Sequence, residues 1–289
     1  MRPFAYHRPE SLAAALQLLR EHGAGARVLA GGTDLIVRLR KRQDVPGIVV
    51  DLKRVAELRA DIVTTDAALR IGARAVISDI VEHQQIRERF PALVEAGLVL
   101  GSIQIRNRAT LAGNLCNASP AADTAPALLV YGARVTMVGN RGTRELPLDE
   151  FLTGPGRTAL GSDELVAAID LPWPPEGSGA AFARLTRRRG VDLAIVSVAC
   201  LASRSGEIRF AFGAVGPRPF VVVRNEADLL EPNIDSEERD AMLGRFFASA
   251  SPISDLRAHD SYRAAMLPVL ARRALAAAVA RMHKARGVR

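Results

Sequence analysis

An apolar stretch close to the N-terminus breaks at two adjacent glycines and then resumes. The stretch reads VLAGGTDLIVRL and covers residues 28–39, with the glycines at positions 31 and 32. Residues 27–30 are typical of a strand and residues 35–39 can begin a helix, while a Gly-Gly pair marks a tight turn. This stretch therefore predicts a strand, a turn of nearly bare backbone, and a helix.

Such a turn can bind an anion. Its successive backbone N–H groups surround one point at the start of a helix, where the helix dipole also favours negative charge. Glycine lets a phosphate oxygen come close to the backbone, and the hydroxyl of Thr33 can donate to it. Because a Gly-Gly pair is also an ordinary turn, this stretch by itself leaves both interpretations open.

A second stretch, residues 106–129, has a similar character. It reads RNRATLAGNLCNASPAADTAPALL and contains a further turn of small residues, ATLAGN, after two arginines. The polar side chains of this turn and of the loop that follows are those of Thr110, Asn114, Asn117, Ser119 and Asp123. Two anion-binding turns suit a diphosphate, and amide and carboxylate groups suit ribityl hydroxyls or the edge of a flavin ring.

The sequence argues against several other kinds of site. It has no G-x-G-x-x-G after a strand and no G-x-x-x-x-G-K-[ST], so neither a Rossmann nucleotide site nor a P-loop is supported. The histidines have no paired spacing, and Cys116 and Cys200 match no disulfide framework, metal site or iron–sulfur cluster. The net charge of +8 is spread along the chain with only 4% aromatic residues, which argues against a nucleic-acid surface.

Breaker residues divide the chain into three predicted units. Residues 1–55 are typical of a small β–α–β unit that needs a partner domain, and residues 56–175 form the second unit. The strongest breaker cluster, PWPP, ends at residue 175 and places the main boundary there. In residues 176–289, three antiparallel strands (LAIVSVACLA, EIRFAFGAV and RPFVVV) precede two predicted helices, at 236–250 and 262–284.

No run of the sequence is long and apolar enough to predict a membrane-spanning helix. The first six residues also lack the apolar core of a signal peptide. We therefore expect a cytoplasmic protein.

These motifs, together with FAYHRPESLAAALQLL, LPWPP and RRRGVDLAIVSVA, resemble those of the FAD-binding medium subunits of molybdenum hydroxylases, such as bacterial xanthine dehydrogenases and carbon monoxide dehydrogenase. The resemblance covers nearly the whole chain, and the two glycine motifs in this order and spacing are highly specific. It implies an α+β fold, with a two-subdomain FAD-binding domain of the vanillyl-alcohol oxidase (PCMH) type. A C-terminal domain of a three-stranded sheet and helices would follow.

The resemblance also implies which residues bind the cofactor. Ala30 to Leu35 and Thr110 to Asn114 would wrap the pyrophosphate, and Asp123 would lie by the flavin. The implied FAD-binding residues are Leu29, Ala30, Gly31, Gly32, Thr33, Asp34, Leu35, Leu100, Gly101, Ala109, Thr110, Gly113, Asn114, Asn117, Asp123, Leu165 and Arg184.

Three positions depart from the family pattern. Ala112 replaces the first glycine of a turn that usually reads T-I-G-G, and Leu193 follows Asp192 where relatives often have an aromatic residue. Arg184 stands where relatives often carry a lysine near the flavin ring, and it keeps the charge but not the compact ammonium. These departures leave the flavin potential and the choice of acceptor open.

The resemblance implies no catalytic residue and no metal in this chain, because the flavin carries the chemistry. Substrate would be oxidised in a molybdopterin-binding large subunit. Electrons would pass through two-iron, two-sulfur clusters of a small subunit to FAD, and then to NAD, a quinone or oxygen. The implied assembly is a dimer of heterotrimers that binds no nucleic acid and has no membrane span.

Three other functions remain open at this point. A stand-alone FAD-dependent oxidase or dehydrogenase of the vanillyl-alcohol oxidase type would need its own base or a covalent flavin. A medium subunit like that of 4-hydroxybenzoyl-CoA reductase would need a cysteine-bearing loop for a further cluster, and the chain has only two cysteines. A non-enzymatic basic binding protein would leave both glycine motifs unexplained.

Overall fold

The N-terminal part of the chain forms a small parallel sheet. The computed structural model describes residues 1–284, so the last residues of the third predicted unit, 285–289, lie outside it. The strands run in the order β1-β3-β2, with both pairs parallel. The elements here are β1 (Ala5–His7), α1 (Leu12–His22), η1 (Gly23–Gly25), β2 (Ala26–Leu29), α2 (Leu35–Arg40), β3 (Ile48–Asp51) and η2 (Leu52–Arg54). The predicted strand, glycine turn and helix are confirmed as β2, the loop 30–34 and α2.

The helix α1 packs on the N-terminal parallel sheet. Its N-cap is Ser11, whose side chain accepts a hydrogen bond from the backbone N–H of Ala14 at 3.2 Å. Ala15, Leu16 and Leu19 are buried on the face that covers the parallel sheet. A helix with one apolar stripe is stabilised mainly by burying that stripe, which here closes one side of the N-terminal core.

The second part of the chain is an antiparallel sheet covered by short helices. Its strands run in the order β4-β5-β10-β6-β7. They are β4 (Ile62–Thr64), β5 (Ala68–Gly72), β6 (Arg134–Gly139), β7 (Gly142–Pro147) and β10 (Glu164–Pro172). The helices are α3 (Ile77–Glu82), α4 (Gln84–Arg89), α5 (Pro91–Leu98), α6 (Ile103–Arg106), α7 (Leu111–Asn117), α8 (Thr124–Val130) and α9 (Leu148–Phe151), and β8 (Leu152–Gly154) pairs with β9 (Arg157–Thr158).

The third part is a four-stranded antiparallel sheet followed by helices. Its strand order is β11-β12-β13-β14, from β11 (Gly179–Leu185), β12 (Val196–Ala202), β13 (Glu207–Gly213) and β14 (Phe220–Asn225). The predicted three strands are β12 to β14, and the prediction was wrong in omitting β11. After η3 (Ala227–Leu230), α10 (Ser236–Gly244) is shorter than the helix predicted to reach residue 250, and α11 (Asp260–Lys284) begins slightly earlier than predicted.

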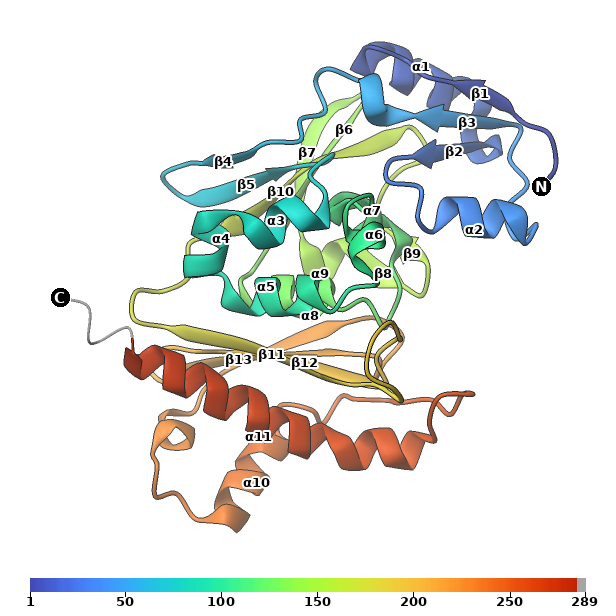
Figure 1. Cartoon of the computed structure of the whole chain (residues 1–289). Helices are drawn as coiled ribbons and strands as arrows, with labels where there is room; N and C mark the ends of the chain where they lie inside the picture. The colour runs from blue at the N-terminus through green and yellow to red at the C-terminus, as the bar shows by residue number, and fades with distance from the viewer. Residues whose placement is uncertain (285–289) are drawn as a thin grey trace.

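The layers stack so that the short helices lie between two sheets. In Figure 1 the helices α5 and α8 lie between the second sheet and the third sheet, and α11 covers the other face of the third sheet. The side chains of β12 alternate accordingly: Ala199 and Leu201 join the core of the middle layer, whereas Val198 and Cys200 join the core beneath α10 and α11. Within residues 1–284, no helix is both long and apolar enough to cross a membrane.

The contact between α11 and β11 is close enough to forbid a side chain. A Cβ atom on Gly179 would lie 2.1 Å from the carbonyl oxygen of Ala278 and 2.4 Å from the backbone nitrogen of Met282. We expect Gly179→Ala to lower the free energy of unfolding by about 1–3 kcal/mol, because the helix must move away from the strand. Urea unfolding measures this change.

The matched control is Gly154→Ala in β8, where a Cβ would meet no atom within 4 Å. Its unfolding midpoint should stay close to that of the wild type. Equal midpoints for both variants would contradict the close packing of α11 on β11.

Candidate functional site

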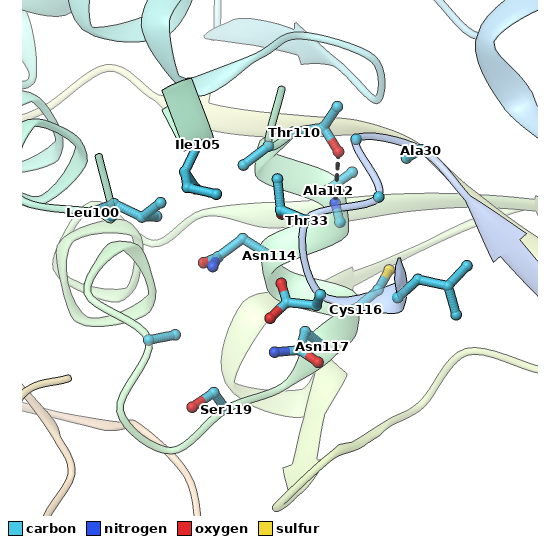
Figure 2. Close-up of a pocket in the computed structure, with 18 of the residues that line it drawn as sticks. Ala30, Thr33, Leu100, Ile105, Thr110, Ala112, Asn114, Cys116, Asn117 and Ser119 are labelled. Carbon is cyan, nitrogen blue, oxygen red and sulfur yellow. Dashed lines mark hydrogen bonds between the residues drawn. The ribbon is translucent and has the colours of Figure 1, made fainter. Parts of the chain in front are cut away.

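A cavity of about 660 Å³ lies where the three parts of the chain meet. Its walls come from the loop 30–34, from the segments around α6 and α7, from β10, and from the loop 188–193 between β11 and β12. Figure 2 shows part of this wall, with α7 and the polar side chains of Asn114, Asn117 and Ser119. A cavity of this size, largely apolar with a few polar groups, is typical of a cofactor site.

The loop 31–34 presents a row of backbone N–H groups without acceptors. Within the described residues, no hydrogen bond uses the N–H groups of Gly31, Gly32, Thr33 or Asp34 as donors. Gly32 has a φ of +78°, a conformation that glycine adopts without strain. Adjacent free N–H groups in such a loop form a concave site for an anion.

The two glycine motifs touch each other backbone to backbone. A Cβ atom on Gly31 would lie only 2.0 Å from the carbonyl oxygen of Arg108 and 2.9 Å from the Cα of Ala109. The second motif is fixed from its other side by the segment after β5, because Ile77 N–H donates to Ala109 O at 2.9 Å and Val76 pairs with Thr110. Both motifs therefore line the same cavity.

The second motif is a helix start and not the small-residue turn that the sequence predicted. Thr110 is the N-cap of α7, and its Oγ1 accepts a hydrogen bond from the N–H of Gly113 at 3.0 Å. The prediction was wrong because a capping threonine before Leu111 and Ala112 favours helix more than the glycine opposes it. Ala112 itself is buried on the cavity wall.

Side chains beyond α7 add polar groups to the wall. Asn114 Oδ1 accepts a hydrogen bond from Thr124 Oγ1 at 2.6 Å, which leaves the Asn114 amide nitrogen free to donate into the cavity. Asn117 and Ser119 lie on the same wall (Figure 2). Apolar residues, among them Leu100 and Leu165, line the rest.

A buried pair of hydrogen-bonded side chains, Arg184 and Asp123, lies at one end of the cavity. Arg184 Nη1 lies 2.7 Å from Asp123 Oδ2, and the two side chains are only 11% and 8% exposed. Burial raises the pKa of Asp123 to about 7, although Arg184 lowers it. The second oxygen, Asp123 Oδ1, is buried and has no hydrogen-bond partner among residues 1–284, so this end of the cavity has an acceptor to offer.

The structure brings almost all of the predicted site residues to this one cavity. The predicted residues that line it are Ala30, Gly31, Gly32, Thr33, Asp34, Leu35, Leu100, Gly101, Ala109, Thr110, Gly113, Asn114, Asn117, Asp123 and Leu165. Leu29 and Arg184 are not among the lining residues: the side chain of Leu29 lies beneath Gly32, and Arg184 holds Asp123.

Sequence reasoning missed several residues of the wall. Arg74, Ile105, Leu160 and Arg188 line the cavity, each outside the residues assigned to the two motifs. No local pattern marks them, because they reach the cavity only through the packing of distant segments. Arg188 belongs to the arginine run RRRG at residues 187–190 and is the arginine of that run that lines the cavity.

Comparison with known proteins gives matches along nearly the whole chain. The sequence family described as "FAD binding domain in molybdopterin dehydrogenase" matches residues 2–174, and "CO dehydrogenase flavoprotein C-terminal domain" matches residues 180–278. The chain is 31% identical to a putative xanthine dehydrogenase FAD-binding subunit of Escherichia coli (strain K12), over 96% of each chain. It is 32% identical to the carbon monoxide dehydrogenase medium chain of Hydrogenophaga pseudoflava, over 96% of this chain and 98% of that one.

The fold agrees with these matches. A solved structure of carbon monoxide dehydrogenase from Hydrogenophaga pseudoflava, which lacks the Mo-pyranopterin moiety of the molybdenum cofactor, superimposes with a TM-score of 0.88. The sequences are 31% identical, and the match covers 97% of this chain and 99% of the other.

The raised pKa of Asp123 predicts a pH-dependent stability. The folded protein keeps Asp123 protonated up to about pH 7, whereas the unfolded carboxyl loses its proton near 3.8. The stability from the neutral carboxyl is therefore present at low pH and is lost as the pH rises from about 4 to about 7. Relative to wild type, Asp123→Asn should gain unfolding free energy over this interval, by up to about 1.4 kcal/mol per pH unit, and nothing further above it.

Urea unfolding of both proteins at several pH values measures the difference. Asp79→Asn, which changes an exposed aspartate, is the control and should show no such slope. A constant difference between Asp123→Asn and wild type would mean that Arg184 keeps Asp123 ionised throughout.

Proposed function

The chain belongs to the family of FAD-binding medium subunits of molybdenum hydroxylases. From this premise we propose that its cavity holds FAD, which acts as one carrier in an electron-transfer chain. In the proposed cytoplasmic holoenzyme, a molybdopterin-binding large subunit oxidises the substrate. A small subunit with two-iron, two-sulfur clusters passes the electrons to this chain, and NAD, a quinone or oxygen accepts them. The proposed assembly is a dimer of heterotrimers.

One observation carries the assignment of the cofactor site. The free N–H groups of residues 31–34 lie against the second glycine motif, in a cavity of about 660 Å³. This cradle suits the diphosphate of FAD, because it offers several donors and no side chain at the point of closest approach. We assign the diphosphate to Ala30–Leu35 and to Thr110–Asn114.

The other polar groups fit the rest of the cofactor. The free donors of Asn114 and Asn117 and the hydroxyl of Ser119 suit the ribityl hydroxyls. Asp123 Oδ1 is an acceptor without a partner, which suits an N–H group at the edge of a flavin ring. Arg184 is a positioning residue in this proposal, since it holds Asp123 rather than lining the cavity.

The cofactor site takes contributions from all three proposed units. We assign FAD binding to residues 1–55 and 56–175, and we propose that residues 176–289 close the site through the loop 188–193. Bound FAD would supply a carrier that accepts one or two electrons. The chain's own residues bind it, orient it and cover it with an apolar wall.

Reconstitution of the full-length chain with FAD tests the cofactor site. We expect about one FAD per chain in the visible spectrum of the wild type, and a loss of most of it in Gly31→Ala, because the new Cβ pushes the loop away from Arg108. Gly32→Val should have a similar effect, since it adds a branched side chain at a φ of +78°.

The control is Gly25→Ala, where a Cβ would meet no atom within 4 Å. It should keep the flavin content of the wild type. Equal flavin in Gly31→Ala and Gly25→Ala would exclude the loop 31–34 as the diphosphate site.

Co-expression with the proposed large and small subunits tests the proposed electron path. We expect the chain to co-purify with an iron–sulfur subunit and a molybdopterin subunit, and its flavin to be reduced by the substrate of the large subunit only in the complex. Flavin reduction by a small substrate in the isolated chain would instead support the stand-alone oxidase or dehydrogenase.

A further inference from the structure

Arg74 is a half-buried cation with no carboxylate partner in the described part of the chain. It lines the main cavity and also a smaller cavity of about 80 Å³ beside it. Other arginines of the main cavity differ from it. Arg27 and Arg38 share the buried carboxylate of Asp44, at 3.2 and 2.7 Å, and Arg188 is exposed to solvent.

The hydrogen bonds of Arg74 leave most of its guanidinium unused. Nη1 donates to the carbonyl oxygen of Lys53 at 2.6 Å, and Nε is buried with no acceptor in the described part of the chain. A guanidinium carries five N–H donors, and a buried donor without a partner destabilises the folded state. The arrangement becomes favourable when an anion supplies the missing acceptors and the missing negative charge.

The backbone fixes Arg74 next to the two glycine motifs. The backbone N–H of Arg74 donates to the carbonyl oxygen of Arg59 at 2.9 Å. The segment that follows pairs with the second motif through Val76 and Thr110. Gly31 and Thr110 line both cavities, as Arg74 does. The cation therefore stands where the cradle of free N–H groups meets the second motif.

We infer that Arg74 binds the diphosphate of FAD and supplies the positive charge that the cradle of residues 31–34 lacks. The inference rests on the proposed function. Backbone N–H groups donate hydrogen bonds but carry no net charge, whereas a diphosphate carries two negative charges. A planar guanidinium matches phosphate oxygens in a two-pronged contact.

Flavin titrations of Arg74 variants test this inference. The full-length protein, with any subunits that co-purify, is freed of flavin and titrated with FAD at several KCl concentrations while flavin fluorescence is followed. Arg74→Gln should raise the Kd for FAD about tenfold to a hundredfold and make its dependence on salt shallower. Riboflavin, which has no phosphate, should bind Arg74→Gln and wild type equally.

Two further variants separate the effect of the positive charge of Arg74 from the effect of its shape and of its structural contacts. Arg74→Lys should keep the salt dependence and lose only several-fold in FAD affinity, because lysine keeps the charge without the fork. Arg108→Gln changes a cation that lines only the small cavity, and it should stay within about twofold of wild type.

Two results would overturn the inference. One is an FAD affinity of Arg74→Gln within twofold of wild type. The other is an equal loss for FAD and riboflavin with an unchanged salt dependence, which would assign Arg74 a structural role through Lys53. If Arg74→Gln does not fold, Arg74→Lys takes its place in the test. An FAD affinity of Arg74→Lys equal to that of the wild type would then overturn the inference. Failure of the wild type to bind FAD at all would instead refute the proposed function.

Discussion

The arrangement of the site depends on one backbone contact, between Gly31 and the segment Arg108–Ala109. At this point the first motif, at the end of a parallel sheet, meets the second motif, which lies far along the chain. The contact admits no Cβ atom, so the loop 31–34 can lie directly against the start of α7. The loop lines the cavity, and within residues 1–284 none of its N–H groups at positions 31–34 donates a hydrogen bond to the protein.

The third sheet completes the site, although it carries neither glycine motif. Glu95 of α5 accepts hydrogen bonds from the backbone N–H of Phe182, at 2.8 Å, and from Arg281 of α11. Arg281 also donates to the carbonyl oxygen of Ala180 at 2.6 Å. A carboxylate with two charge-assisted contacts holds β11 onto α5, and that position lets the strand carry Arg184 to Asp123. The C-terminal part of the chain therefore shapes the cavity through β11, the strand that the sequence analysis did not predict.

The sequence predicted what local patterns determine and missed what only packing determines. The strand, glycine turn and helix of the first motif and the strands β12 to β14 follow from residue type and spacing. The strand β11 was missed because GAAFARL has little contrast between apolar and polar positions, and its place is set by the contact of Gly179 with α11. Arg74 was missed for a similar reason: nothing in IGARAV marks an arginine that enters the cavity only when three segments meet.

The guanidinium of Arg184 connects several segments at one end of the cavity. Besides Asp123 Oδ2, it donates to the carbonyl oxygens of Asp192, at 3.3 Å, and Gly190, at 3.5 Å. One planar side chain thereby ties β11, the start of α8 and the loop 188–193 together. A lysine ammonium is a compact donor on a flexible stem and does not reproduce this fixed fork. Leu193 of this loop is 45% exposed, so its side chain is only partly packed against the rest of the protein. The guanidinium of Arg184 therefore fastens the loop 188–193 through the backbone carbonyl oxygens of Gly190 and Asp192.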